Sequence, residues 1–177
     1  MVLRNKKIHL RYGENPNQIA HLISYSNKSV YDYQISGKKI SYNNLIDLDS
    51  GIRCLNEFRE PTSIIVKHTN PCGVASAKDI NTAFKKSYES DKKSAFGGII
   101  FLNRKVDSNL ANKIIKNFFE MVVAIDFEMK AIELLKSKKN LILLKMPIIK
   151  NKKVEYKSTL FGDLYQTTDT VKINQKF

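Results

Sequence analysis

Two neighbouring side chains that can carry or transfer protons, Lys67 and His68, directly follow a short apolar segment. That segment, Ile64-Ile65-Val66, consists of three consecutive β-branched residues, a pattern typical of a buried strand. An imidazole can take a proton from a nucleophile, and an ammonium group can stabilise negative charge that develops on an oxygen. We therefore expect a catalytic pair at the carboxyl end of a strand, where open α/β proteins bind their ligands.

The order of the two residues imposes a geometric condition. Successive residues of an extended strand point to opposite faces, so Lys67 and His68 share a site only if the chain turns between them. The following segment, residues 69–73 (TNPCG), contains proline and glycine and predicts a turn in place of a continued strand. Either residue alone is more typical of a surface lysine or an ordinary loop histidine, but the pair favours the catalytic interpretation.

The rest of the chain alternates apolar strands with amphipathic helices. This alternation predicts an α/β fold with a mainly parallel sheet flanked by helices, in which the strands ending at Lys67, Leu102 and Ile125 present their loops at one edge. Helices are expected to begin after the caps Asn43 or Asn44, Asp79, Asp107 or Ser108, and Asp126. Further strands are expected at two places in 29–42, at 99–102, 121–125 and 140–144, and, as edge strands, at 154–160 and 162–166.

Three parts of the chain are distinguished by composition. Residues 1–28 are polar and contain Gly and Pro, so we expect a loop or an extended arm, followed by a compact subdomain over 29–166 and a frayed tail over 167–177. In the arm, Arg11, Tyr12 and Gly13 offer a guanidinium group, a flat ring and a flexible backbone, which suit a phosphate or a planar base. Gly97 and Gly98, before the 99–102 strand, predict close backbone approach either to a ligand or to a neighbouring element.

The composition limits the class of protein. The 177 residues suffice for one α/β domain, and the formal net charge of +13 first suggests a nucleic-acid partner. The lysines are scattered, however, without an arginine-rich arm, so we expect mostly solvated surface and no nucleic acid. No membrane-length apolar run or signal peptide is found, which predicts a cytoplasmic protein without a membrane partner. The spacing of the cysteines and histidines predicts reduced thiols and no metal site.

Several stretches are distinctive in both residue types and order. They are residues 10–18 (LRYGENPNQ), 41–49 (SYNNLIDLD), 66–75 (VKHTNPCGVA), 94–100 (SAFGGII) and 138–141 (KKNL). Together they resemble the AICAR transformylase domain of the bifunctional purine-biosynthesis enzyme AICAR transformylase / IMP cyclohydrolase. The resemblance covers most of residues 8–166.

The resemblance implies a reaction and roles for individual residues. The family transfers a formyl group from 10-formyltetrahydrofolate to the 5-amino group of AICAR, a weak nucleophile because its lone pair is delocalised. His68 would take the proton of that amine and Lys67 would stabilise the charge on the formyl oxygen. The same comparison assigns contacts to five residues by position: Arg11 and Tyr12 to AICAR, Gly97 to AICAR through its backbone, Glu120 to the ribose, and Phe96 to the folate side.

The resemblance also implies an architecture larger than this chain. This chain would correspond to the first of two transformylase subdomains that resemble the cytidine deaminase fold. No zinc site is expected in it, because Pro71-Cys72 is not followed by the second cysteine of the deaminase signature. The cyclohydrolase domain and the second transformylase subdomain of the family are expected to be absent. AICAR and folate are the expected ligands, and a homodimer or a complementing second subdomain is the expected partner.

Three hypotheses about function follow from these observations. The chain is part of a split formyltransferase that is incomplete alone, or it is a non-catalytic remnant or fragment. The third hypothesis, a basic nucleic-acid-binding module, is supported by the net charge but by none of the motifs.

Overall fold

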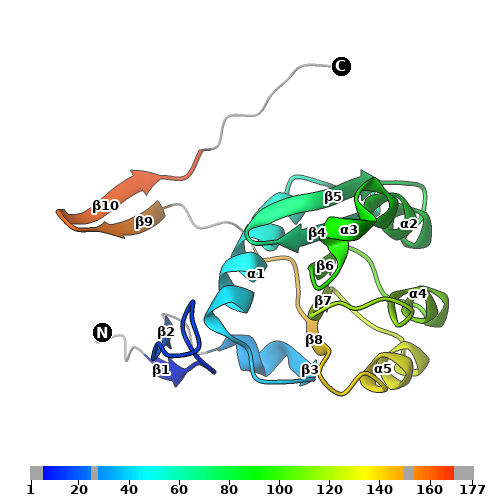
Figure 1. Cartoon of the computed structure of the whole chain (residues 1–177). Helices are drawn as coiled ribbons and strands as arrows, with labels where there is room; N and C mark the ends of the chain where they lie inside the picture. The colour runs from blue at the N-terminus through cyan, green and yellow to red at the C-terminus, as the bar shows by residue number, and fades with distance from the viewer. Residues whose placement is uncertain (1–5, 25–27, 150–153, 170–177) are drawn as a thin grey trace.

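The central feature of the computed structural model, which describes residues 6–24, 28–149 and 154–169, is a six-stranded sheet between two layers of helices (Figure 1). The strands lie in the order β3-β8-β7-β6-β4-β5. Their bounds are β3 Gln34–Ser36, β4 Thr62–Lys67, β5 Asn70–Ser76, β6 Ile99–Leu102, β7 Met121–Ala124 and β8 Ile142–Lys145.

The strand directions confirm the α/β class but not the mainly parallel sheet. Strand β7 is parallel to β6 and β8, whereas β4 is antiparallel to both β5 and β6, and β3 is antiparallel to β8. The sheet is therefore mixed. The physical reason is the length of the connections, since a helix crosses between each parallel pair but only two residues join β4 to β5.

The helices form two layers, with α1 on one face of the sheet and α2, α4 and α5 on the other (Figure 1). Their bounds are α1 Tyr42–Leu55, α2 Ile80–Ser90, α3 Lys92–Ala95, α4 Ser108–Ile114 and α5 Met129–Lys136. A short 3₁₀ helix, η1 Val30–Tyr33, and the single strand β3 occupy the segment predicted to form two strands. The second predicted strand, at 40–42, does not form, because Tyr42 already begins α1. Apolar residues spaced for one buried face do not distinguish a single 3₁₀ turn from a short strand.

The helix caps agree with the predictions in two cases out of four. Asp79 and Asp107 accept from the backbone N–H groups of Thr82 and Leu110, as predicted. Helix α1 is capped by Ser41 in place of Asn43 or Asn44, because Ser41 Oγ accepts from the N–H of Asn44 at 3.2 Å. Helix α5 begins only after Glu128, while Asp126 instead pairs with Lys105 and Lys145.

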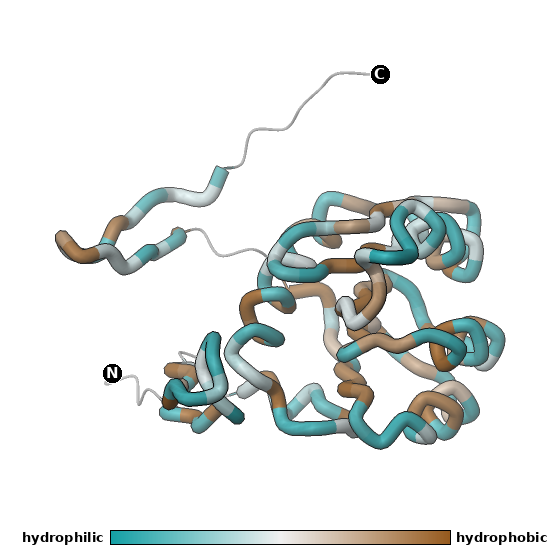
Figure 2. The backbone as a smooth tube through the Cα atoms, viewed as in Figure 1, coloured by the Kyte–Doolittle hydropathy of each residue, from teal (hydrophilic) through white to brown (hydrophobic). Residues whose placement is uncertain are grey.

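The core is built from strands that are apolar on both faces. In β4, Ile64 and Val66 pack in the cluster under α1, whereas Ile65 packs in the cluster under α2, α4 and α5. Strand β6 divides in the same way, with Phe101 toward α1 and Ile100 toward the other layer. Figure 2 accordingly shows hydrophobic colour concentrated in the central strands. Burial on both faces explains why the sequences of these strands are uninterrupted apolar runs.

Close packing of α1 on β6 makes a prediction about Gly51. A Cβ atom at this position would lie 2.1 Å from two atoms of the buried Phe101 ring. Although Gly→Ala in an exposed helix interior stabilises by about 1 kcal/mol, we expect Gly51→Ala to destabilise the chain by about 1–3 kcal/mol through overpacking. Urea unfolding measures the change. The exposed Glu89→Ala on α2 serves as control, and an unchanged or raised unfolding midpoint for Gly51→Ala would contradict the packing described here.

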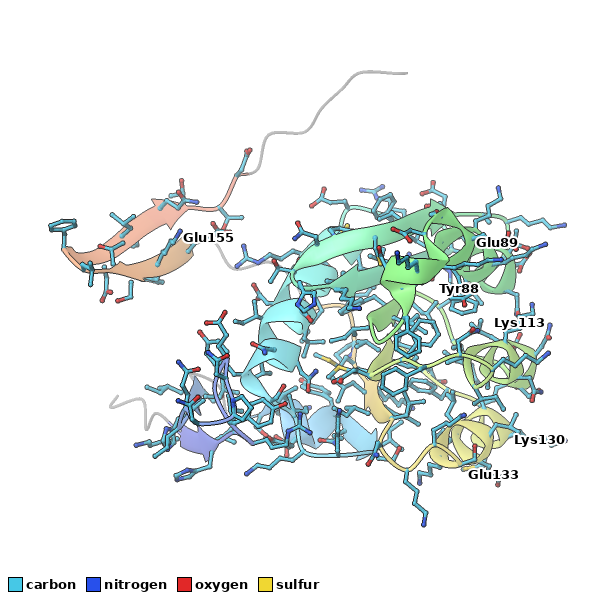
Figure 3. All side chains as sticks on the ribbon, in the orientation of Figure 1. Tyr88, Glu89, Lys113, Lys130, Glu133 and Glu155 are labelled. Atoms are coloured by element: carbon cyan, nitrogen blue, oxygen red, sulfur yellow. The ribbon has the colours of Figure 1, made fainter. Side chains whose placement is uncertain are left out.

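Two hairpins lie outside the central sheet. Strands β1 Lys6–His9 and β2 His21–Ser24 pair with each other, so the expectation of a loop or extended arm over residues 1–28 is wrong for these two segments, and residues 10–20 join them. Strands β9 Val154–Thr159 and β10 Gly162–Thr167 confirm the two predicted strands near the C-terminus. Glu155 of β9, labelled in Figure 3, forms an ion pair with Arg53 of α1. Residues 1–5, 25–27, 150–153 and 170–177, and with the last range most of the predicted tail, lie outside the described residues. The division of the chain into three parts stays a prediction.

Candidate functional site

The turn after β4 is a two-residue turn formed by His68 and Thr69. Both residues are in the left-handed region, with φ of 53° and 65°, as in a type I′ hairpin turn. Strand β4 ends at Lys67 as expected, but the prediction of a turn over residues 69–73 is wrong beyond Thr69, because Asn70–Ser76 forms β5 and pairs with β4. Strand β5 is an edge strand with an irregular register next to Pro71, and a proline is tolerated there. The chain nevertheless turns between Lys67 and Asn70, as the catalytic pair requires.

Helix α1 holds this turn from the neighbouring layer. Asp47 Oδ1 accepts from the backbone N–H of Thr69 at 2.7 Å, and Ser50 Oγ donates to the carbonyl oxygen of Thr69 at 2.6 Å. The side chain of Asn70 donates to the carbonyl of His68 at 2.9 Å. These bonds fix the backbone of the turn while the His68 residue remains exposed.

Lys67 links the end of β4 to the segment that enters β6. Its Nζ donates to the carbonyl oxygen of Phe96 at 2.8 Å, and the residue is half-buried. Val66 of β4 lies opposite Ile99 of β6, so the carboxyl end of β4 adjoins the amino end of β6. Lys67 and Phe96, predicted as separate parts of the site, are thus in direct contact.

The strand ends that meet at this site differ from the predicted ones. Because β6 and β7 run antiparallel to β4, their carboxyl ends at Leu102 and Ala124 lie at the opposite end of the sheet from Lys67. The expectation that the loops after Lys67, Leu102 and Ile125 meet is therefore wrong. The candidate site lies at the carboxyl end of β4 and the amino ends of β6 and β7.

Gly97 and Gly98 both have backbone reasons to be glycine. Gly97 adopts a φ of +76°, and its N–H donates to the carbonyl of Phe118 at 2.9 Å. A Cβ on Gly98 would lie 3.1 Å from Ile65 Cγ2 and from the carbonyl oxygen of Val66. Of the two alternatives left open by the sequence, close approach to a neighbouring element is confirmed for Gly98. The proposed contact of Gly97 with a ligand stays a prediction.

Glu120 lies directly before β7 and is held by several groups. Its N–H donates to the carbonyl of Gly98 at 3.0 Å, Oε2 accepts from Asn44 Nδ2 at 3.0 Å, and Oε1 pairs with Lys38 Nζ at 3.2 Å. Burial raises the pKa of Glu120, but the hydrogen bonds from Asn44 and Lys38 and the charges of Lys38 and Arg11 outweigh it, so the pKa is lowered. Glu120 is therefore an ionised acceptor at neutral pH.

The lowered pKa of Glu120 predicts a pH-dependent stability. The stabilisation from ionised Glu120 is complete above the ordinary value of 4.5 and is lost as the pH falls through the lower pKa of the folded state. We expect the unfolding free energy of the native chain to exceed that of Glu120→Gln near neutral pH, and the difference to shrink in acid. Urea unfolding across this range measures it. The same comparison in a Lys38→Met background should give a smaller difference, and a difference independent of pH would contradict the argument.

The N-terminal arm brings Arg11 and Tyr12 to this carboxylate. The arm is attached by the N–H of Arg11, which donates to the carbonyl of Ile40, and by the N–H of Tyr42, which donates to the carbonyl of Tyr12. Arg11 Nη2 donates to Tyr12 Oη at 2.6 Å, and its Cζ lies 4.5 Å from the centroid of the Tyr12 ring. The charge of Arg11 also contributes to the lowered pKa of Glu120, so Arg11 interacts electrostatically with this carboxylate.

An exposed aromatic pair borders the site. Phe96 is 61% exposed and Phe118 is 49% exposed, and their ring centroids lie 5.1 Å apart at an interplanar angle of 44°. Large apolar side chains that remain this exposed offer a contact surface for a flat or apolar ligand. Phe96 was predicted for the folate side, and Phe118 adds a second ring to it.

The structure thus joins the predicted residues in two groups. Lys67, Phe96 and Gly97 form one group, Arg11, Tyr12 and Glu120 form the other, and the Glu120–Gly98 backbone bond links them. His68 lies in the turn beside Lys67. Among the residues with described positions, no cluster of three or more His, Cys, Asp or Glu side chains is arranged to hold a metal ion.

Sequence reasoning missed four residues that position this site. Asn44 was predicted only as a possible helix cap, and Asp47 was given no role in the site. Lys38 and Ser50 gave no signal. Their partners, Glu120 and Thr69, lie far along the chain, and a single sequence contains no information on such pairings.

The fold and this site define an α/β domain in which a lysine, a histidine turn and a hydrogen-bonded glutamate lie at one end of the sheet. Comparison with known proteins assigns this domain to a family. The family model for the AICARFT/IMPCHase bienzyme matches residues 1–177, and the chain belongs to this family. The resemblance inferred from the motifs is confirmed.

Individual relatives agree with this assignment. The bifunctional purine biosynthesis protein PurH of Caldicellulosiruptor bescii is 47% identical over 169 residues, which cover 91% of this chain and 33% of the relative. The protein of the same name from Thermoanaerobacter sp. (strain X514) is 44% identical over 172 residues, covering 94% and 33%. That of Bacillus cytotoxicus is 42% identical over 177 residues, covering 97% and 35%. The chain therefore spans about a third of the length of these relatives. None of the helices in the described residues has the length and apolarity needed to cross a membrane.

Proposed function

We propose that the chain forms part of an AICAR formyltransferase of purine biosynthesis, which transfers a formyl group from 10-formyltetrahydrofolate to AICAR. The observation that carries the proposal is the Lys67 ammonium group, fixed on the carbonyl of Phe96 next to the exposed His68 turn. Membership of the AICARFT/IMPCHase family, and the name of the relatives, support purine biosynthesis as the context.

In the proposed reaction, His68 acts as the general base. The amine of AICAR attacks the formyl carbon, His68 accepts the proton that the amine loses, and the bond between the formyl carbon and the folate nitrogen breaks. That nitrogen takes up a proton as it leaves. The exposure of His68 in a turn with a fixed backbone allows a substrate amine to reach the imidazole.

Lys67 stabilises the charge that forms on the formyl oxygen during this attack. An ammonium group has three N–H donors, so the bond from Lys67 to Phe96 orients the side chain and leaves two donors for the substrate. The partial burial of Lys67 lowers the local dielectric and strengthens its interaction with the oxyanion.

The second group of residues binds AICAR. Ionised Glu120 accepts hydrogen bonds from the ribose hydroxyls, while Arg11 and Tyr12 contact the nucleotide through charge and ring stacking. Phe96 lies on the side of the folate. The lowered pKa of Glu120 supports its role, because only the ionised carboxylate accepts on both oxygens.

The site is proposed to be incomplete in this chain alone. The chain spans about a third of its relatives, and His68, Phe96 and Phe118 are exposed on the described part. We propose that a second transformylase subdomain, or a second copy of the chain, covers this face and excludes water from the reaction.

The test is reconstitution. The chain is mixed with a separately produced second transformylase subdomain of the family, and formyl transfer to AICAR is followed with both substrates saturating. We expect activity from the mixture that neither component shows alone. A silent mixture in which both components are folded would overturn the split-enzyme proposal and favour a non-catalytic fragment.

A further inference from the structure

Two of the three histidines of the chain face each other across the hairpin formed by β1 and β2 (Figure 1). His9 is the last residue of β1 and His21 is the first residue of β2, and the pairing register places them directly opposite. Their ring centroids lie 4.2 Å apart at an interplanar angle of 60°. The proposed reaction gives neither imidazole a role, although imidazole is the commonest metal ligand among the side chains.

A ring contact of this kind is also typical of a purely structural cross-strand pair. Two features favour a further role for His9 and His21. His9 is exposed and His21 is only half-buried, so solvent reaches the pair. Among the residues that the structure describes, neither imidazole has a hydrogen-bond partner, so the ring nitrogens are available as ligands.

The charges around the pair are mixed. Lys7 lies two positions before His9 on the same face of β1, and its ammonium group opposes the binding of a cation. His21, however, lines a hollow of about 510 Å³ together with Glu14 and Tyr42. The carboxylate of Glu14 offsets the charge of Lys7, and the hollow leaves room for water molecules beside the imidazole.

We propose that His9 and His21 together bind one divalent cation of the late transition-metal class, represented by Zn²⁺ and Ni²⁺, an inference independent of the proposed function. One nitrogen of each ring binds the ion, at about 2.0–2.1 Å for Zn²⁺, and water completes the coordination. The described part of the chain contains no group of three or more metal-binding side chains, so this site has two protein ligands. Imidazole selects these metals over Mg²⁺, which prefers oxygen ligands.

A bound ion joins the two ends of the loop that carries the predicted AICAR contacts of the arm. This loop begins after His9 and ends before His21, and the N–H of Leu10 donates to the carbonyl of Ala20 at 3.0 Å. Because the ion links the strands next to this bond, it opposes local opening of the hairpin. The spacing of the histidines along the chain predicted no metal site, since only the pairing of β1 with β2 brings them together.

The experiment titrates ZnCl₂, NiCl₂ and MgCl₂ into the full chain, produced without an affinity tag, and follows binding by calorimetry. The ligand variants are His9→Phe, His21→Phe and the two combined, because phenylalanine keeps a ring at the cross-strand contact but has no nitrogen to bind a metal. The matched control is His68→Phe, which removes the third histidine of the chain. Broadening of histidine ring NMR signals by paramagnetic Ni²⁺ locates the ion.

We expect one Zn²⁺ or Ni²⁺ per chain, no binding of Mg²⁺, and an unchanged affinity in His68→Phe. Each single ligand variant should bind the ion at least roughly tenfold more weakly, since loss of even an outer-shell partner typically costs about 10–100-fold in metal affinity. The single variants should bind nearly as weakly as the double variant, because the two rings hold the same ion.

Three outcomes would overturn the proposal: native affinity in either single ligand variant, an equal loss in His68→Phe, or two weak sites that disappear one at a time. Broadening confined to the ring signals of His68 would do the same. In the native chain, Zn²⁺ should also slow amide hydrogen exchange at Leu10, and it should not do so in His21→Phe. Exchange at Leu10 that is equally fast with and without bound Zn²⁺ would show that the ion does not link the two strands.

Discussion

Replacing Lys67 with alanine is expected to reduce formyl transfer by the reconstituted enzyme roughly a thousandfold, the loss typical of removing one group that stabilises an oxyanion. The reason is the position of the ammonium group, which the Phe96 carbonyl holds at the junction of β4 and β6. The loss should appear in both kcat and kcat/KM, because the charge on the formyl oxygen exists only in the transition state. Steady-state kinetics in which each substrate is varied while the other is saturating measures both constants.

The same substitution should leave the fold intact, which makes the kinetic result interpretable. Lys67 is only half-buried, and its Nζ bonds to a carbonyl near the surface, so the stability loss should stay below about 1 kcal/mol. Lys67→Arg retains the charge and should keep part of the activity, while the exposed Lys85→Ala should keep all of it. Activity of a folded Lys67→Ala enzyme within tenfold of the native value would mean that another group stabilises the oxyanion.

The comparison of sequence and structure shows which features a local pattern can determine. The strands β6 and β7 were predicted almost to the residue, because four consecutive apolar residues between polar segments identify a strand buried on both faces. The direction of β4 was predicted wrongly, as parallel to its neighbours. It depends on the partner with which β4 pairs, and its apolar residues are the same for either direction.

The candidate site was predicted in its residues but not in its geometry. Lys67 and His68 were found because two reactive side chains directly follow an apolar run. The contacts that place Glu120, from Asn44 across 76 positions and from Lys38, link distant segments and leave no local pattern. The arm residues Arg11 and Tyr12 were singled out for their chemistry alone, and only the fold shows that the charge of Arg11 acts on Glu120.

The position of the turn, at His68 and Thr69, was missed for a specific physical reason. A two-residue hairpin turn of this type is usually recognised by Asn-Gly or Asp-Gly, since both positions require positive φ. Here His68 and Thr69 occupy these positions, and a β-branched residue at a φ of 65° is strained. Strain of this kind persists where surrounding contacts impose it and is concentrated at functional sites. Asp47 and Ser50 supply such contacts to Thr69.

This strain leads to the second large expected effect. His68→Gly should reduce the rate of formyl transfer roughly a hundredfold to ten-thousandfold, because it removes the general base. It should not destabilise the chain, since relief of about 1–2 kcal/mol of left-handed strain at His68 is only partly offset by the added entropy of glycine in the unfolded state. The variant should thus be inactive and at least as stable as the native chain. Kinetics of the reconstituted enzyme and urea unfolding of the chain measure the two effects.

Thr69→Gly is the matched control, because it relieves the same kind of strain in the same turn but keeps the imidazole. The backbone bond from residue 69 to Asp47 does not depend on the side chain, so this variant should gain stability and retain formyl transfer. Equal loss of activity in both variants would show that the rigid turn, and not the imidazole, is what the reaction requires. A clear loss of stability in His68→Gly would show that the side chain of His68 holds the turn, and the residue would then be structural in place of catalytic.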